Sequence, residues 1–310
     1  MLRRLTSADI ETLRAMIPAD RLFFGDAISA DYAQDEMPEY GKYMPDAVAE
    51  VTGAEEVQAL MAWANEQGVP VVPRGTGTGL CGGAVATHGG LVISTVRMNR
   101  ILEIDEANLT AVIEPGVLLQ DFAAAVEARG LFYPPDPGEK TATVGGNVMT
   151  NAGGMRAVKY GVTRDYVRGM DVVLPGGELL RLGGKVAKMS SGYSLLHLMI
   201  GSEGTLGIVT RLILRLLPLP ACQFSLLVPF EDFEACIRAV PAIMAARTIP
   251  AALEFMEKEI VHDAEAYLGK SFPYEGAEAY LMLRFENATE DEIESLYPAV
   301  AETCLACGAL

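Results

Sequence analysis

The spacing of apolar residues is clearest between residues 52 and 68, where it has a helical period. The apolar stripe occupies positions i, i+3, i+4 and i+7, which are Val57, Leu60, Met61 and Ala64. Thr52 and Glu55 have the spacing of a capping box, and Gly68 follows the stripe as a stop. The pattern therefore predicts an amphipathic helix with one buried face.

Weaker patterns predict the other elements of the first two thirds of the chain. Helices are expected over 6–17, where Thr6 and Asp9 can cap each other, and over 118–129, just before Gly130. Short apolar runs predict strands at 69–73, 91–95, 100–105 and 109–115. A hairpin is expected in MDVVLPGGELLRLGG, around Pro175, Gly176 and Gly177.

From Gln223 onward the pattern is that of a smaller α+β unit. Strands are expected at FSLLVPF, AALEFM and AYLMLRFE, and helices over 232–247 and 289–306. Thr289 and Glu292 can form a capping box for the last helix. The chain then stops at CGAL without the further strand that such a sheet would need, so we expect an interrupted domain.

The stretch from Thr141 to Gly161, TATVGGNVMTNAGGMRAVKYG, contains five glycines, which are Gly145, Gly146, Gly153, Gly154 and Gly161. Glycines at this density cost backbone entropy and supply no core side chains. They are useful where the backbone takes a positive φ or approaches a flat or anionic ligand closely. We therefore interpret the stretch as one that cradles a ligand; structural turns are the alternative.

A second glycine-rich segment, RGTGTGLCGG (74–83), directly follows the predicted strand at 69–73. Its G-x-G-x-x-G spacing suggests a Rossmann dinucleotide site, but that motif must open a helix, and the following AVATHGG has no helical period. A glycine loop between two strands can still bind a diphosphate, because successive N–H groups form a nest for anions. A third glycine cluster, IGSEGTLGIVT, lies near residue 205.

Composition narrows the class of protein. The 310 residues suffice for roughly two domains, and the net charge of −17 disfavours nucleic acid and anionic membranes as partners. No signal peptide is expected in the first residues, where Asp9, Glu11 and Arg14 replace the apolar run that one needs. The longest uncharged apolar run, 216–230, is short and contains three prolines, so no transmembrane segment is expected. Five scattered cysteines suggest reduced thiols in a cytoplasmic protein.

With these clusters placed, the chain resembles the FAD-binding PCMH-type flavoproteins of the vanillyl-alcohol oxidase superfamily. PRGTGTGLCGG, YPPDPGEKTATVGGNVMTNAGGMRAVKYGVTRDY and IGSEGTLGIVT carry the resemblance, and the branch of glycolate oxidase and D-lactate dehydrogenase is the best match. The resemblance implies an α+β protein. We expect an N-terminal helical segment (1–40), an FAD-binding domain of two α+β subdomains (41–220) and an incomplete ferredoxin-like cap domain (221–310).

The resemblance also assigns cofactor contacts residue by residue. The pyrophosphate loop would comprise Pro73, Arg74, Gly75, Thr76, Gly77, Thr78, Gly79 and Leu80. The wall along the ribityl chain and the flavin ring would comprise Pro135, Asp136, Thr143, Gly145, Gly146, Asn151, Gly153, Gly154, Tyr160 and Gly161. A third contact region would comprise Glu203, Gly204, Ile208 and Val209. Some relatives tether FAD through a histidine where this chain has Thr78, so we expect non-covalent FAD.

Individual side chains admit plainer interpretations. His197 is expected to be a packed helical residue rather than a base, and His88 a solvated turn residue. Cys81 is expected to be a buried or neutral thiol. Glu203 fits either a structural role in its loop or a position facing the flavin.

No metal site is predicted. Cys304 and Cys307 form a C-x-x-C without a second pair or a nearby histidine, which is a poor zinc or iron–sulfur signature. Relatives of this branch carry a histidine-rich substrate and metal motif that is absent from these 310 residues. The catalytic base is therefore unassigned, and Arg284 is only a weak candidate for holding a substrate carboxylate.

The resemblance implies an FAD-linked dehydrogenase or oxidase that converts a D-2-hydroxy acid, such as D-lactate or glycolate, to the 2-oxo acid. Hydride would pass to the flavin while a base takes the hydroxyl proton. The alternative is a non-catalytic or truncated FAD-binding subunit, and a partner electron-transfer subunit is possible. A third hypothesis keeps the fold but changes the chemistry to alkyl transfer to a dihydroxyacetone phosphate ester or to enolpyruvyl reduction by NADPH.

Overall fold

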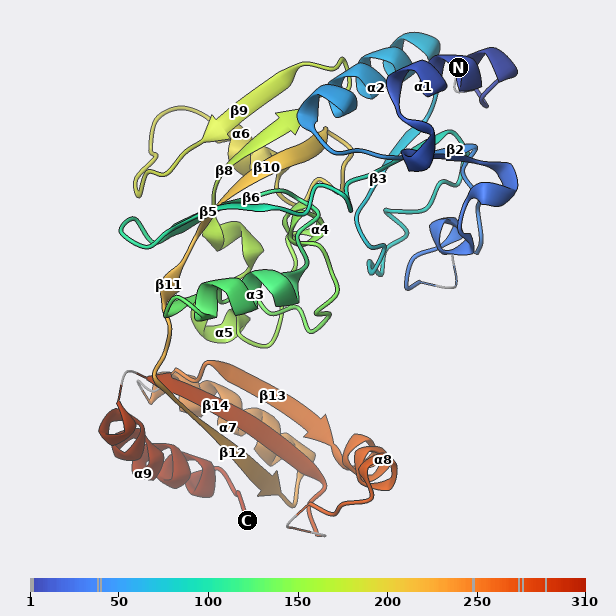
Figure 1. Ribbon diagram of the computed structural model, residues 1–310. Helices are drawn as coiled ribbons and strands as arrows, with labels where there is room; N and C mark the ends of the chain where they lie inside the picture. Colours follow the sequence, from blue (N-terminus) through green and yellow to red (C-terminus); the bar gives the residue numbers. More distant parts are fainter. Residues whose placement is uncertain are drawn as a thin grey trace. The chain divides into compact units, whose positions relative to one another are not determined.

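The computed structural model describes residues 3–37, 39, 41–246, 249–272, 274, 276–287 and 289–310. The chain forms two compact units. The first unit contains the residues up to Tyr133, Glu139–Ala152 and Thr163–Pro218, and the second contains Pro134–Gly138, Gly153–Val162 and Leu219–Leu310. Both units are mixtures of helices and sheets, so the prediction of an α+β protein is confirmed (Figure 1).

The first unit has two main sheets. One sheet has the order β1-β2-β4-β3, from β1 (Leu22–Phe24), β2 (Ala47–Glu50), β4 (Leu91–Ser94) and β3 (Val71–Arg74). The other has the order β5-β6-β10-β8-β9, from β5 (Ile101–Asp105), β6 (Thr110–Ile113), β10 (Ile208–Arg215), β8 (Val167–Val173) and β9 (Leu179–Gly183). β2 and β3 both pair parallel with β4, whereas the second sheet is antiparallel. The short strands β7 (Leu131–Phe132) and β11 (Leu217–Pro218) pair separately.

The helices of this unit are α1 (Ser7–Met16), α2 (Ala54–Gln67), α3 (Leu119–Glu127), α4 (Val144–Thr150) and α6 (Leu195–Met199). The short 3-10 turns are η1 (Ala19–Arg21), η2 (Gly25–Ala27), η3 (Ala30–Ala33) and η5 (Thr163–Tyr166). The predicted stripe of α2 is buried, and it shares one core with Leu13 of α1, Ile93 of β4, and Val173 and Ile208 of the second sheet. α2 therefore connects the cores of the two sheets.

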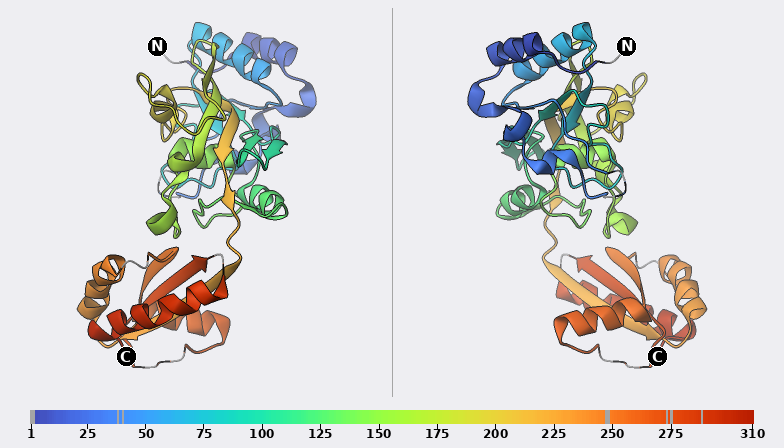
Figure 2. Two further views of the ribbon diagram at one scale, coloured as in Figure 1. Left: turned by 90° about the vertical axis from the view of Figure 1, so that its left-hand side faces the viewer. Right: turned by 90° about the vertical axis from the view of Figure 1, so that its right-hand side faces the viewer.

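The second unit contains a three-stranded sheet of order β12-β14-β13, from β12 (Cys222–Phe230), β14 (Ala279–Asn287) and β13 (Ala252–Glu257). Its helices are α5 (Ala157–Tyr160), α7 (Phe233–Ala245), α8 (Lys258–Leu268) and α9 (Glu290–Ala306). Side chains of α7 and α9 share a core with one face of the sheet, and Figure 2 shows α9 lying along it. α8 was not predicted, although Val261, Ala264 and Leu268 have helical spacing before Gly269.

The ends of three helices test the capping predictions. The capping boxes of Thr6 with Asp9 and of Thr289 with Glu292 are both present. The box of Thr52 with Glu55 is wrong, because α2 starts one residue later with Gly53 as its N-cap. The carboxylate of Glu56 instead accepts from the backbone N–H of Thr52 at 2.8 Å and pairs with Arg21.

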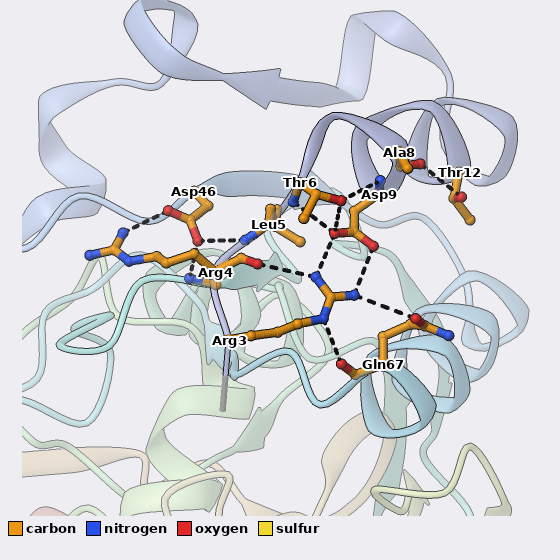
Figure 3. A network of polar contacts seen from close by, with 10 residues as sticks. Arg3, Arg4, Leu5, Thr6, Ala8, Asp9, Thr12, Asp46 and Gln67 are labelled. Atoms are coloured by element: carbon orange, nitrogen blue, oxygen red, sulfur yellow. Dashed lines mark hydrogen bonds and ion pairs between the residues drawn. The ribbon is translucent and has the colours of Figure 1, made fainter. Parts of the chain in front are cut away.

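Asp9 is the centre of a polar network at the start of the chain (Figure 3). Its carboxylate accepts from Arg3 at 2.6 and 2.9 Å and from the backbone N–H and hydroxyl of Thr6, both at 2.7 Å. The Arg3 guanidinium also donates to the Gln67 carbonyl at the end of α2, at 2.9 Å. These bonds to its charged form, led by those from Arg3, hold the pKa of Asp9 well below its usual range.

We expect Asp9→Asn to lower the free energy of unfolding at pH 7 by about 1–2 kcal/mol, because hydrogen bonds to a charged acceptor are lost. A lowered folded-state pKa stabilises the protein above the unfolded pKa, and this contribution is lost as the pH falls through the folded one. The difference between variant and wild type should therefore shrink below about pH 4. Urea unfolding followed by fluorescence of Trp63, the only tryptophan, measures both values.

The matched control is Glu11→Gln, which removes an exposed ion pair with Arg14 in the same helix. That change should cost less than about 0.5 kcal/mol. Equal stability of wild type and Asp9→Asn at pH 7 would contradict the assigned role of Asp9.

Candidate cofactor site

The loop after β3 is held in place by Arg74, the last residue of that strand. The Arg74 side chain is buried, donates to the carbonyls of Ala84 at 3.1 Å and Asp31 at 2.8 Å, and stacks over the ring of Tyr32 at 5.4 Å. Burial lowers its pKa, since the charged form loses water. Gly77 has a φ of +81°, and a Cβ on it would overlap the Arg74 guanidinium. Only a glycine at position 77 therefore leaves room for the Arg74 side chain in this position.

The backbone donors of this loop have no acceptors within the described chain. None of the N–H groups from Gly75 to Cys81 donates to another described residue, whereas Gly82 N–H donates to the Asp35 carboxylate at 2.8 Å. These groups form a run of unused donors in a protein rich in negative charge. Such a run can bind an anion, because each N–H offers a partial positive charge and Gly75, Gly77 and Gly79 have no side chain to obstruct it.

The same loop packs directly on the glycine-rich stretch that begins at Thr141. A Cβ on Gly75 would overlap the hydroxyl of Thr143, and the Thr76 hydroxyl donates to the Thr141 carbonyl at 3.0 Å. Thr143 is the N-cap of α4 and accepts from the Gly146 N–H at 3.2 Å. Gly145 packs on Pro115 with an N–H···O bond of 2.8 Å. Each glycine lies where the backbone must come close to a neighbour.

The third glycine cluster, near residue 205, contacts both α4 and the loop after β3. Glu203 has a φ of +51°, and its N–H donates to the carbonyl of Met149 in α4 at 2.8 Å. Its carboxylate lies against Gly83, where a Cβ would be 2.9 Å from Oε2, and a Cβ on Gly204 would overlap Pro73. The loop 74–83, the part of the glycine stretch up to Ala152, and the third cluster are far apart in sequence and are thus brought together within the first unit. The structural role expected as one alternative for Glu203 agrees with these contacts.

Asn151 ends α4 in the left-handed conformation with a φ of +50°. Its side-chain oxygen accepts from the Arg164 N–H at 2.9 Å, and a Cβ on Gly201 would lie 3.3 Å from the Cβ of Asn151. This position therefore joins α4 to the turn before β8 and to the third cluster.

The predicted contacts divide between the units. Pro73 to Leu80, Thr143, Gly145, Gly146, Asn151, Glu203 and Gly204 are gathered in the first unit. Ile208 and Val209 belong to it too, but their side chains are buried in β10, so only their backbone could face a ligand. Pro135, Asp136, Gly153, Gly154, Tyr160 and Gly161 belong to the second unit.

Three residues that support the site were not singled out from the sequence. Tyr32 stacks on Arg74, Asp31 accepts from it, and the buried Asp35 accepts from the N–H groups of Gly82 and Met37. The Glu36 N–H also donates to the Gly79 carbonyl at 3.0 Å. The segment around 31–37 has no periodic pattern, and only its density of acidic and aromatic residues marks it.

Two expectations about single side chains were wrong. His197 lies in α6 as predicted but is exposed rather than packed, and its ring nitrogen is 2.6 Å from the Ser194 hydroxyl. Cys81 is exposed at the glycine loop, so the buried alternative expected for its thiol is wrong. His88 is exposed beside Thr87, as predicted.

No helix in the described part of the chain has the length and apolarity that a membrane span requires. The described residues also contain no group of three or more histidine, cysteine or acidic side chains arranged to hold a metal ion.

Comparison with known proteins agrees with this geometry. Residues 45–183 match the family described as FAD binding domain, and residues 219–310 match the C-terminal domain of FAD linked oxidases. The chain is 51% identical to a D-lactate dehydrogenase of Anaerostipes hadrus, over 99% of this chain and 66% of that protein. It is 47% identical to glycolate oxidase subunit GlcD of Bacillus subtilis (strain 168), over 84% of this chain and 55% of that protein.

Solved structures support the same fold. Alkyldihydroxyacetonephosphate synthase matches with a TM-score of 0.84 at 21% identity, over 100% of this chain and 61% of that one. p-Cresol methylhydroxylase matches with a TM-score of 0.79 at 19% identity, over 98% and 65%. The chain spans between 55% and 66% of the length of these proteins. It belongs to the FAD-linked oxidases, with their FAD-binding domain followed by their C-terminal domain.

Proposed function

We propose that this chain binds FAD non-covalently and forms the flavin-binding part of a dehydrogenase for D-2-hydroxy acids of the D-lactate or glycolate type. The observation that carries the proposal is the run of unused N–H donors from Gly75 to Cys81, beside α4 and the third glycine cluster. The relatives named D-lactate dehydrogenase and glycolate oxidase subunit GlcD support the substrate class.

The residues present fit FAD. The diphosphate of FAD carries two negative charges, and in a chain of net charge −17 it needs oriented donors close by. The N–H groups of Gly75 to Cys81 would hold it, and Arg74 would keep their loop in place. The segments containing Thr143–Asn151 and Gly153–Gly161 would contact the rest of the cofactor. Thr78, in place of a tethering histidine, leaves the cofactor free of a covalent link.

The chemistry of the proposed reaction is a two-electron oxidation. The bound flavin would supply the acceptor for the hydride that leaves the α-carbon of the substrate. This chain's residues would orient the cofactor and exclude water from its binding loop, and a base not assigned to any residue would take the hydroxyl proton. The products are the 2-oxo acid and the reduced cofactor.

We also propose a cytoplasmic location and transfer of the electrons to a partner subunit. Five free cysteines, two of them buried in the core of the second unit, favour a reducing compartment. A dehydrogenase must pass its electrons to a second acceptor. One relative is named as a subunit of glycolate oxidase, and this name supports a partner protein as that acceptor.

We expect Gly75→Ala to weaken FAD binding at least tenfold, about 1.4 kcal/mol. The new methyl group would overlap the Thr143 hydroxyl, so the donor loop must move away from α4. Fluorescence titration of the flavin-free protein with FAD measures the Kd.

Gly184→Ala is the matched control. A methyl group on Gly184 would have no other heavy atom within 4 Å, and the residue has no positive φ, so this variant should bind FAD like the wild type. Equal affinity of all three proteins would show that the loop does not bind the cofactor.

We expect the purified chain to show a flavin spectrum. Bleaching of that spectrum under anaerobic conditions by D-lactate or glycolate, and not by L-lactate, would show that the chain itself oxidises a D-2-hydroxy acid. A flavin spectrum without bleaching would instead favour the non-catalytic FAD-binding subunit. A colourless protein that cannot be reconstituted with FAD would contradict the whole proposal.

A further inference from the structure

The second unit contains a buried carboxylate that the sequence did not single out. Glu286, near the end of β14, is only 6% exposed. The Tyr160 hydroxyl donates to its Oε2 at 3.1 Å, and the Nε of Arg156 lies 3.7 Å from its Oε1. Both partners come from the segment 153–162, which contains four of the predicted cofactor contacts.

Arg156 links this carboxylate to a second one. Its Nη1 lies 3.7 Å from the Oδ2 of Asp136, which is 8% exposed and belongs to the segment 134–138. Gly154 packs on the backbone of Asp136 so closely that a Cβ would overlap the Asp136 carbonyl. Three segments distant in sequence, 134–138, 153–162 and β14, are thus joined around one guanidinium group.

The backbone of Glu286 takes part as well. Its carbonyl accepts from the Nζ of Lys159 at 2.9 Å, and the same ammonium group lies 5.1 Å from the centre of the Tyr160 ring. α5 therefore contacts this one residue of β14 through Arg156, Lys159 and Tyr160. Three successive contacts of different kinds fix both the position and the rotation of a single-turn helix.

Burial of a carboxylate is costly unless it is well compensated, and a pair held at 3.7 Å is only partly so. An apolar residue at this point of β14 would serve packing better. Glu286 makes sense where the geometry of its partners is what matters, because a hydrogen-bonded carboxylate fixes direction as well as contact.

We propose that Glu286 is a positioning residue of the FAD site. Through Tyr160 and Arg156 it sets the conformation of the segment 153–161, and through Arg156 that of Asp136. The sheet of the C-terminal domain thereby takes part in cofactor binding. This inference rests on the proposed assignment of Asp136, Gly153, Gly154, Tyr160 and Gly161 to FAD, and it adds a residue from the other family domain.

The test compares Glu286→Gln with Glu254→Gln in the full chain. Glu254 is half-buried on β13, one strand away, and it makes no hydrogen bond or ion pair with the described residues of the segment 153–162. The two variants therefore remove the same charge from the same sheet. Glu286→Gln should weaken FAD binding about tenfold and change the visible circular dichroism of the bound flavin at saturation. Glu254→Gln should change the Kd less than twofold and leave the spectrum as in wild type.

A double-mutant cycle shows whether Glu286 acts through Tyr160. Tyr160→Phe alone should weaken FAD binding several-fold, and the double variant should bind little worse than Glu286→Gln. Multiplication of the two single effects would overturn the link between the residues. A lower melting temperature of Glu286→Gln with unchanged FAD affinity and spectrum would overturn the proposal and leave Glu286 a structural residue.

Hydrogen exchange of the wild-type chain tests the same idea without any variant. Addition of FAD should slow exchange in 153–161 and in 281–287 together, but not in the distant α8. Protection of 153–161 without any effect on 281–287 would overturn the role of Glu286. Failure of the wild type to bind FAD at all would overturn the proposed function itself, and with it this inference.

Discussion

The first unit depends on backbone segments that approach one another more closely than any side chain would allow. Gly75 against Thr143, Gly145 against Pro115 and Gly204 against Pro73 are contacts at which a single added carbon would force the segments apart. Close packing of this kind is unforgiving, because protein interiors relax only partly around an added atom. The glycines therefore fix the distances between the donor loop, α4 and the turn before β10.

That constraint explains why the loop can leave its N–H groups unused. A glycine-rich loop loses much conformational entropy when it is ordered, and hydrogen bonds within the loop normally offset part of that loss. Here the ordering comes from outside the loop. Arg74 is buried beneath it, Asp35 accepts from its far end at Gly82, and Thr76 is tied to Thr141. The backbone N–H groups from Gly75 to Cys81 are thus held in place without donating to any acceptor in the described chain.

Local signals in the sequence predicted most of the elements. The box of Thr6 with Asp9 and the stripe of α2 are determined by residues within two turns of each other, and both are present. The predicted capping box of Thr52 with Glu55 is absent. Glu56, one residue further on, accepts from the Thr52 N–H instead and pairs with Arg21, which comes from a distant segment. The expectation that the glycine-rich segments meet came from the family resemblance, not from spacing.

The residues that support the site from outside could not be predicted in the same way. Asp35 has no neighbour in sequence that marks it, and its partner Gly82 lies 47 residues away. Glu286 is one acidic residue among 41, and its strand reads as an ordinary buried strand, so only a contact made in three dimensions distinguishes it.

Between Tyr133 and Thr163 the chain changes from one compact unit to the other four times. The stretch between these residues therefore contributes segments to both units. Within the second unit, Arg156 pairs with Glu286 of β14 and with Asp136 of the segment 134–138. Residues that the family resemblance assigns to the cofactor are therefore ordered by a strand of the C-terminal domain. The boundary between the two family domains in sequence is therefore not a boundary in the contacts that hold these residues.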